Sequence, residues 1–250
     1  GLMEVEKDGR IIRFVEKPGN TDLLSELRAP LYAEERYLAN MGIYIFNTNV
    51  LAKLLDNECD DFGRDVIPAS IDCFNVRSYV FEDYWKDIGT IHSFWEANLA
   101  LTDVVPEFNF YDPRAPIYTN MRYLPPSKIN CCDLNRCLLS DGCIISGHRI
   151  LHSIIGLRAV VGDGSVVEHS VLMGCDFYET VEHGRGTPAL GIGRDCFIRN
   201  AIIDKNARIG DGAYITPDGK ANDTVTELYT VRDGIIVIPK NAVIPPGTRL

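Results

Sequence analysis

The second half of the chain repeats aliphatic residues at every sixth position, a period that fits neither an α-helix nor a plain strand. The repeat begins after Lys128 and occurs in several registers. Its members are Leu139, Ile145 and Leu151; Ile155, Val161 and Val167; Ile192 and Ile198; Ile203, Ile209 and Ile215; and Ile238, Ile244 and Leu250. This period predicts a parallel β-helix, in which each side of a triangular coil takes six residues and points one aliphatic side chain inward.

Small residues accompany this repeat, four positions after many of the aliphatic ones. They are Cys143, Ser165, Cys196, Ala207, Ala213 and Ala242. Residues 161–166 and 209–214 are close to ideal hexapeptides, with glycines that give the backbone freedom at the corners. Two polar stretches, 178–190 and 220–233, interrupt the repeat, and we expect both to loop out from one face of the coil.

The eight cysteines contain no CxxC pair and no metal-ligand spacing, which favours a reducing compartment. Three of them, Cys143, Cys175 and Cys196, stand at the small inward position of the repeat, so we expect a structural role for them. Adjacent Cys131 and Cys132 do not easily face one partner.

The overall composition excludes two classes of function. With 25 basic and 35 acidic residues the net charge is −10, so a nucleic-acid surface rich in Lys and Arg is not expected. No run of 18 apolar residues occurs, so we expect no membrane span and a soluble chain. An anionic substrate then requires a local positive pocket.

The first hundred residues mix strand and helix patterns, which is typical of an α/β domain. Residues 3–14 read as strand, Asp-Gly turn and strand, and 37–46 and 76–81 read as further strands. Residues 49–55 form a short helical pattern after possible caps at 47 or 48, and 90–101 form an amphipathic helix with Thr90 as its N-cap. Since a hairpin alone is marginal in water, we expect part of its sheet to be encoded upstream.

Prolines separate the two halves of the chain. Five prolines lie between residues 106 and 126, and proline removes a backbone donor and fixes φ. We therefore expect a catalytic domain over 1–112, a linker over 113–127 and a β-helix over 128–250.

Two short motifs carry residues suited to phosphate chemistry. Glu16 and Lys17 follow a predicted strand, and a lysine at a strand end is a compact cation suited to a phosphate. Asp87 stands just before a predicted helix, where a carboxylate can bind Mg²⁺ together with substrate phosphates. The plain alternatives are a solvated surface pair for the first motif and a helix cap for the second.

Taken together, five segments resemble the glucose-1-phosphate adenylyltransferases, also called ADP-glucose pyrophosphorylases. The segments are 9–18, 40–46, 61–68, 84–91 and 201–210. The resemblance implies a partial Rossmann-like α/β nucleotidyltransferase domain followed by a left-handed parallel β-helix. It also implies the reaction of ATP with glucose 1-phosphate to give ADP-glucose and pyrophosphate, in starch or glycogen synthesis.

The resemblance implies roles for individual residues. Lys17 would hold the phosphate of glucose 1-phosphate, Glu16 would contact the sugar, and Asn40 and Gly42 would line the glucose pocket. Asp87 would be one of two carboxylates that hold the catalytic Mg²⁺, the other lying upstream of the chain. Asp87 and Lys17 are therefore the expected catalytic residues.

In the β-helix, the same resemblance implies a site for an anionic allosteric effector. Lys205 and Lys240 look like the effector-binding lysines of the plant and cyanobacterial branch, and Arg208 and Arg158 would assist them. From the chain alone, Lys205 reads as a solvent-facing residue. The resemblance further implies a homo- or heterotetramer, located in the plastid stroma or, in a bacterium, in the cytoplasm.

Departures from the family pattern leave two alternatives open. The family's glycine-rich nucleotide-binding loop is missing, so we expect the chain to be a C-terminal part of such an enzyme that does not by itself bind ATP competently. Asn40 replaces a common Ser and Lys86 replaces a common Glu, which, with the retained effector lysines, points to a weakly catalytic regulatory subunit. A hexapeptide acyltransferase is the second alternative, with one of four histidines as the base. These histidines are His148, His152, His169 and His183.

Overall fold

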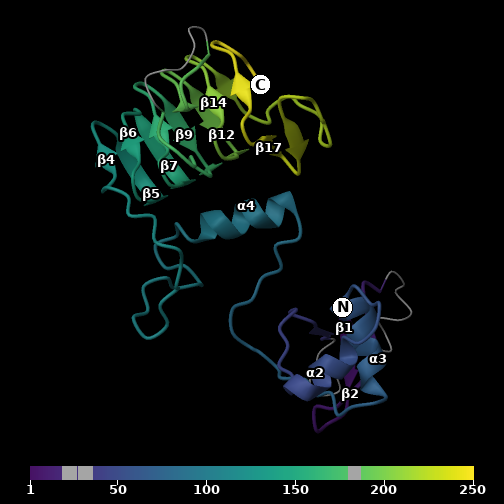
Figure 1. The fold of residues 1–250 in the computed structure, drawn as a ribbon. Helices are drawn as coiled ribbons and strands as arrows, with labels where there is room; N and C mark the ends of the chain where they lie inside the picture. Colours follow the sequence, from purple (N-terminus) through teal and green to yellow (C-terminus); the bar gives the residue numbers. More distant parts are fainter. Residues whose placement is uncertain (19–26, 28–35, 180–186) are drawn as a thin grey trace. The chain divides into compact units, whose positions relative to one another are not determined.

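A computed structural model describes residues 1–18, 27, 36–179 and 187–250. The chain packs into two compact units, Gly1–Asp83 and Tyr84–Leu250, called unit 1 and unit 2 below. Figure 1 shows the ribbon of each.

Unit 1 is built on a three-stranded sheet in the order β2-β1-β3. The central strand β1 (Leu2–Val5) pairs antiparallel with β2 (Ile11–Val15) on one side and with β3 (Leu38–Ala39) on the other. The predicted hairpin is thereby confirmed. Because both outer strands oppose β1, they run parallel to each other, and their C-terminal ends lie at the same end of the sheet.

The described part of unit 1 contains three short helical segments: α2 (Thr48–Leu54), a π-helix (Phe62–Val66) and α3 (Ile67–Ile71). The predicted helix over 49–55 is confirmed as α2, with Asn47 at the N-cap position. A buried cluster joins α3 to the sheet, and it consists of Val5, Ile11, Phe14, Ile67 and Ile71.

Two strand predictions in unit 1 are wrong in extent. The expected strand over 37–46 ends at Ala39, because Asn40 accepts a hydrogen bond from the backbone N–H of Gly42 (3.0 Å) and Gly42 has φ of 73°. The expected strand over 76–81 is reduced to an isolated bridge between Arg77 and Arg10. Local β propensity was present in both stretches, but neither has a full-length partner strand in the described part of the unit.

Unit 2 contains a parallel β-helix, made of two sheets that wind through successive coils (Figure 1). One sheet contains β5 (Asp133–Leu139), β7 (Arg149–Ile155), β9 (Val166–Glu168), β10 (Val171–Leu172), β12 (Phe197–Arg199), β13 (Ala201–Ile203), β15 (Tyr214–Ile215), β16 (Thr230–Arg232) and β17 (Ile235–Ile238). The other contains β4 (Lys128–Ile129), β6 (Ile144–Ile145), β8 (Val160–Val161), β11 (Gly191–Ile192), β14 (Arg208–Ile209) and β18 (Val243–Ile244). Among the described residues, the pairings between these strands are parallel except that of β16 with β17, which lies at the end of the predicted insertion over 220–233.

The interior of the β-helix follows the predicted repeat. The aliphatic residues of the repeat that are almost fully buried are Ile145, Ile155, Val161, Val167, Ile192, Ile198, Ile203, Ile209, Ile215, Ile238 and Ile244. The small residues Cys143, Ser165, Cys196, Ala207 and Ala213 are also buried, as is Cys175. All eight cysteines are free thiols. Each coil therefore buries large and small side chains in alternation, which lets neighbouring coils pack closely.

One position of the predicted repeat is wrong. Leu151 was expected to point inward, but Ile150 takes that place and is fully buried, while Leu151 is half-buried. His152 has φ of 45° and forms the corner between Ile150 and Ile155, so each step in this part of the coil is five residues rather than six. The number of residues between successive inward-pointing positions therefore depends on the corner conformation, which the sequence repeat does not specify.

Helix α4 (Ile91–Ala100) packs on the outside of the β-helix. Thr90 caps it in a capping box with Ser93, so the predicted N-cap is confirmed. The helix contributes Ile91, Phe94, Trp95 and Leu99 to a cluster with Val171, Ile202 and Ile235 of the sheet. The indole N–H of Trp95 donates to the carbonyl of His169 (2.8 Å). For this reason the boundary between the compact units precedes α4, whereas the expected linker over 113–127 stays a prediction.

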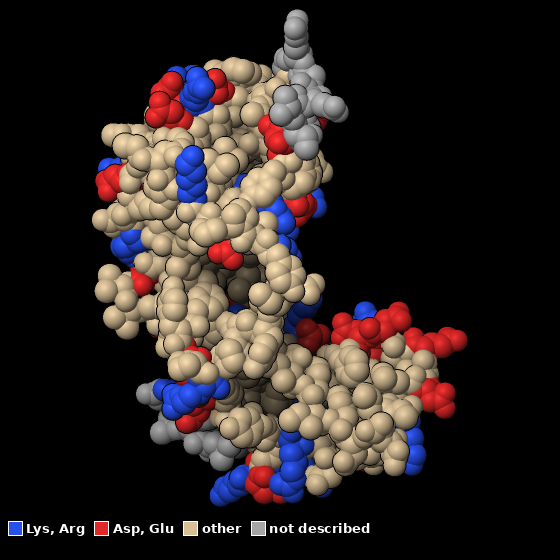
Figure 2. Space-filling view, turned by 60° about the vertical axis from the view of Figure 1, so that its left-hand side comes forward, with Lys and Arg blue, Asp and Glu red and all other residues tan. Residues whose placement is uncertain are grey.

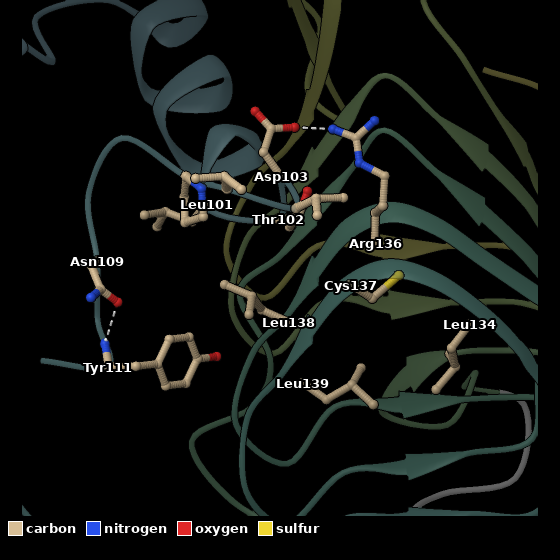
Figure 3. Close-up of a pocket in the computed structure, with 13 residues that line it drawn as sticks. Leu101, Thr102, Asp103, Asn109, Tyr111, Leu134, Arg136, Cys137, Leu138 and Leu139 are labelled. Carbon is tan, nitrogen blue, oxygen red and sulfur yellow. Dashed lines mark hydrogen bonds and ion pairs between the residues drawn. The ribbon is translucent and has the colours of Figure 1, made fainter.

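A cavity of about 670 Å³ lies in unit 2 between the segment after α4 and the edge strand β5. Figure 3 shows its lining, in which Leu134, Leu138 and Leu139 come from β5 and Asp103 pairs with Arg136. The lining contains none of the residues expected to bind substrate, metal or effector.

Within the described residues, no helix is both long enough and apolar enough to cross a bilayer.

The contact between α4 and the β-helix includes a histidine whose ionisation is suppressed. His152 Nε2 lies 3.3 Å from the Arg136 guanidinium, its ring packs edge-on against His169 at 5.2 Å, and Asp103 lies 4.0 Å away. Burial lowers the pKa of His152 most, and the charges of Arg136 and His169 lower it further. Asp103 and a backbone hydrogen bond with Leu99 raise this pKa but do not offset the lowering.

Because the pKa of His152 is lower in the folded state than in the unfolded state, its contribution to the free energy of unfolding depends on pH. The contribution is complete above the ordinary pKa of about 6.5 and declines as the pH falls below that value. We predict that the free energy of unfolding of unit 2 decreases between about pH 7 and pH 5, and that H152Q removes part of this decrease. Urea unfolding followed by tryptophan fluorescence measures the effect. H148Q, at an exposed position, is the control, and an H152Q profile that parallels the wild type would contradict the prediction.

Candidate functional site

Four of the residues expected to bind sugar phosphate lie at one end of the unit 1 sheet. Glu16 and Lys17 directly follow β2, and Asn40 directly follows β3. The register explains their proximity, because Leu2 of the central strand pairs with Val15 on one side and with Ala39 on the other. The fold therefore gathers two motifs that are more than twenty residues apart in sequence.

The carboxylate of Glu16 is half-buried at this end of the sheet. Its Oε2 atom lies 3.2 Å from the amino group of Gly1. The same oxygen lies beside Gly63, where a β-carbon would stand only 2.8 Å from it. Glu16 is thus held close to backbone on two sides, which limits the positions that its carboxylate can take.

Lys17 is exposed and holds a strained backbone conformation. Its φ is 46°, in the left-handed region that costs a residue other than glycine about 1–2 kcal/mol. Within the described part of the chain, no carboxylate pairs with its ammonium group. Strain of this kind gathers at functional sites, where the surrounding structure maintains it. The ammonium group is therefore available to an external anion.

Asn40 is held in a defined orientation by an aromatic neighbour. Its Nδ2 donates to the Tyr44 hydroxyl (2.7 Å), and its Oδ1 accepts from Gly42 N–H. The Tyr44 ring in turn stacks on Phe62, with ring centroids 5.7 Å apart and planes 20° apart. Tyr44 and Phe62 lie in two of the segments that resemble the family, but no local pattern indicates a role for either residue. Their stacking joins residues that are far apart in sequence.

Asp87 lies in unit 2, in the exposed segment before α4. Thr90 is the N-cap of that helix, so Asp87 does not cap it and the capping alternative is wrong. Among the described residues, the Asp87 carboxylate has no hydrogen-bond or ion-pair partner. Neighbouring Lys86 pairs with Glu96 of α4 (2.5 Å), so the positive charge that replaces the family's acidic residue is neutralised locally.

A second cluster lies on the β-helix and contains the two lysines expected to bind an effector. Lys205 Nζ and Lys240 Nζ share the carboxylate of Asp176, at 3.1 and 3.4 Å, and Asn206 donates to it at 3.0 Å. The hydrogen bond from Lys205, followed by that from Asn206, lowers the pKa of Asp176 to about 2. Asp176 was missed in the sequence because it lies 29 residues before Lys205 and nothing in its local pattern marks it.

The fold aligns this cluster at one corner of successive coils. Asn206 and Asn241 both have left-handed φ, at 62° and 61°, and the Asn206 side chain donates to that of Asn241 (3.2 Å). Each asparagine directly follows one of the two lysines. Because stacked coils repeat the same corner, the ammonium groups come to lie near one carboxylate.

The two arginines expected to assist are placed differently. Arg158 lies on a neighbouring coil, where it donates to the carbonyl of Cys175 (3.3 Å) and covers the Tyr178 ring. Arg208 is only 11% exposed and pairs with Glu179 (2.5 Å). Arg158 thus lies next to the residue preceding Asp176, whereas Arg208 anchors the start of the insertion over 178–190.

The histidines considered for an acyltransferase do not form one cluster. His152 and His169 pack against each other under α4. His148 is exposed, and His183 lies outside the described residues. On the face seen in Figure 2, Lys and Arg side chains are scattered in small groups, several of which lie next to Asp or Glu.

Comparison with known families identifies both parts of the chain. Residues 1–104 match the family model of nucleotidyl transferases. Residues 122–248, just over half of the chain, match that of the GLGC left-handed parallel β-helix domain. The chain is accordingly a nucleotidyltransferase that carries a left-handed β-helix, and the expected fold class and handedness are confirmed.

The order of these two domains is more specific than either alone. A nucleotidyl transferase domain followed by a GLGC β-helix is the architecture of the ADP-glucose pyrophosphorylases, and the chain belongs to this family. The acyltransferase alternative leaves the first hundred residues unexplained, whereas the nucleotidyl transferase model matches residues 1–104.

The backbone strain at Lys17 gives a prediction about stability. Glycine relieves the strain of a left-handed φ, and alanine does not, so K17G should be more stable than K17A by about 1 kcal/mol. Urea unfolding of the two variants measures the difference. At Lys7, which has no left-handed φ, K7G should instead be no more stable than K7A. Equal stability of K17G and K17A would contradict the prediction.

Proposed function

We propose that this protein acts as a glucose-1-phosphate adenylyltransferase, which converts ATP and glucose 1-phosphate to ADP-glucose and pyrophosphate. One observation carries the proposal: β2 and β3 end together, so that the Lys17 ammonium and the oriented Asn40 amide stand at one end of a nucleotidyl transferase sheet. The GLGC β-helix that follows supports ADP-glucose as the product.

The side chains at this end of the sheet suit a sugar phosphate. Lys17 would neutralise the phosphate of glucose 1-phosphate, because its ammonium lacks a carboxylate partner in the described residues. Glu16 would accept hydrogen bonds from sugar hydroxyl groups, since an ionised carboxylate is only an acceptor. Asn40 and the exposed backbone of Gly42 would line the glucose pocket and fix its orientation.

In the proposed reaction, a phosphate oxygen of glucose 1-phosphate attacks the α-phosphorus of ATP. A new oxygen–phosphorus bond forms, the bond between the α-phosphorus and the bridging oxygen to the β-phosphate breaks, and pyrophosphate leaves with the electron pair. The protein's part is to position the two anions and to neutralise charge, and no side chain needs to form a covalent bond. Lys17 serves both purposes by holding the attacking phosphate.

Mg²⁺ is the proposed cofactor, and Asp87 is one proposed ligand. Its exposed carboxylate has no partner among the described residues, and Mg²⁺ characteristically takes one or two carboxylates and completes its shell with water and substrate phosphates. When bound, Mg²⁺ would neutralise the charge of the ATP phosphates.

We further propose a role in starch or glycogen synthesis, within a homo- or heterotetramer, in the plastid stroma or in a bacterial cytoplasm. The support is the family's domain architecture.

Substitution of Lys17 tests the substrate assignment. In K17A, the KM for glucose 1-phosphate should rise by about 10- to 100-fold, because a charge-assisted contact contributes about 1.5–3 kcal/mol, while the KM for ATP stays nearly unchanged. Steady-state assays of pyrophosphate release by the full-length protein measure both constants. The control is K7A, an exposed lysine of the same hairpin. A wild-type enzyme that prefers another nucleotide or sugar phosphate, or a K17A variant with an unchanged KM, would contradict the proposal.

The lysine pair of the β-helix is the proposed site of an anionic effector. Lys205 and Lys240 carry two positive charges against the single negative charge of Asp176, so the cluster retains a net positive charge. Arg158 lies close enough in the fold to add to it, through its contact with Cys175. An anionic effector would bind to the two lysine ammonium groups in place of the Asp176 carboxylate.

This exchange predicts the behaviour of D176N. Removing the carboxylate frees both ammonium groups, and because exposed ion pairs contribute about 0.2–1 kcal/mol, inorganic phosphate should bind about two- to fivefold more tightly. Isothermal titration calorimetry with phosphate measures the change. D163N, at an exposed corner of another coil, is the control. Unchanged or weaker phosphate binding by D176N would contradict the exchange.

A further inference from the structure

The start of the π-helix lies against the proposed sugar-phosphate site, through its first two residues, Phe62 and Gly63. Asp61 caps this helix, since its carboxylate accepts from the backbone N–H of Arg64 (2.8 Å). Two features of this segment, Asp61 to Gly63, connect it to Glu16 and to Asn40.

The first feature is the absence of a side chain at Gly63. Gly63 is buried, and a β-carbon there would lie 2.8 Å from Glu16 Oε2 and 3.4 Å from Glu16 Cδ. Its φ lies outside the left-handed region, so glycine is not required by the backbone conformation. What glycine provides here is the space in which the Glu16 carboxylate lies.

The second feature is the ring of Phe62. It stacks on Tyr44 at 5.7 Å and also lies 6.0 Å from Phe46, forming a small aromatic cluster. The hydroxyl of Tyr44 accepts the hydrogen bond that orients Asn40. Phe62 thereby supports the side chain that fixes the Asn40 amide.

We propose that the start of the π-helix, from Asp61 to Gly63, is the positioning element of the sugar-phosphate site: Gly63 admits the Glu16 carboxylate, and Phe62 supports the Tyr44 side chain that orients Asn40. This inference rests on the proposed function, because it assigns Glu16 and Asn40 to sugar binding. Phe62 and Gly63 are positioning residues and do not touch the substrate.

Substitution of Gly63 separates positioning from stability. In G63A the added methyl group displaces the end of a flexible Glu16 side chain rather than backbone, so the fold should accommodate it. The KM for glucose 1-phosphate should rise about tenfold, as expected for a misplaced charged hydrogen-bonding group, while the KM for ATP and the midpoint of thermal unfolding stay near the wild-type values.

A double-mutant cycle with Glu16 identifies the route of this effect. If Gly63 acts through Glu16, then E16A raises the KM for glucose 1-phosphate, and E16A/G63A raises it no further than E16A alone. An unchanged KM in G63A, or a G63A effect that multiplies fully with that of E16A, would overturn the proposal. A69S, at an exposed position of α3, serves as the local control.

The aromatic half of the element needs its own variant. F62L keeps an apolar side chain but loses the stacking on Tyr44, so the KM for glucose 1-phosphate should rise about threefold, and this rise should disappear in the N40A background. An F62L effect that persists unchanged with N40A would overturn this half of the proposal.

The same assays distinguish failure of this inference from failure of the proposed function. If the wild-type protein uses a different sugar phosphate, the proposed function fails, and the coupling of positions 16 and 63 is then measured with the substrate that the protein accepts.

Discussion

The β-helix depends on one constraint: each coil must present inward-pointing aliphatic side chains that stack on those of the coils above and below. Strands of only two or three residues cannot stabilise themselves, and parallel pairing leaves each coil dependent on its neighbours. The buried columns through Ile145, Val161 and Ile192, and through Val167, Ile198 and Ile215, meet this constraint. Corners with left-handed φ, such as His152 and Asn206, let the short sides close into a coil.

Other features of unit 2 follow from this regular scaffold. Stacked corners repeat the same position every coil, so residues that are far apart in sequence become neighbours on the surface. Asp176, Lys205 and Lys240 meet in this way. Helix α4 covers an outward-facing apolar strip of the same scaffold, through Trp95 and Leu99, and its packing explains why it belongs to the compact unit of the β-helix.

In unit 1, the pairing of strands brings the residues of the candidate site together. A central strand with an antiparallel partner on each side makes the two outer strands end together, and this places Glu16 and Asn40 at one edge of the sheet. The strained φ of Lys17 is a local cost at that edge, and Gly63 leaves the space in which the Glu16 carboxylate lies. The Phe62–Tyr44 stack supports the hydrogen bond that orients the Asn40 amide.

The sequence by itself determined the β-helix, the hairpin, α2, α4 and its Thr90 cap, because each of these depends on a local period or a local capping pattern. It also marked Glu16, Lys17, Asn40 and Asp87 as residues for phosphate and sugar chemistry, through their motifs. The sequence did not predict the strand lengths over 37–46 and 76–81, because a strand extends only as far as its partner does. It also did not predict that Ile150 points inward, since the corner at His152 sets the number of residues between inward positions.

Only the tertiary structure decided which side chains meet. The pairing of Asp176 with two lysines, the support of Asn40 by Tyr44 and Phe62, and the space that Gly63 leaves for Glu16 all join residues separated by many positions. Such contacts depend on strand register and on the stacking of coils, and neither is encoded in any short window of sequence. Local patterns therefore specified most of the elements of this protein, while long-range packing specified the geometry of its candidate sites.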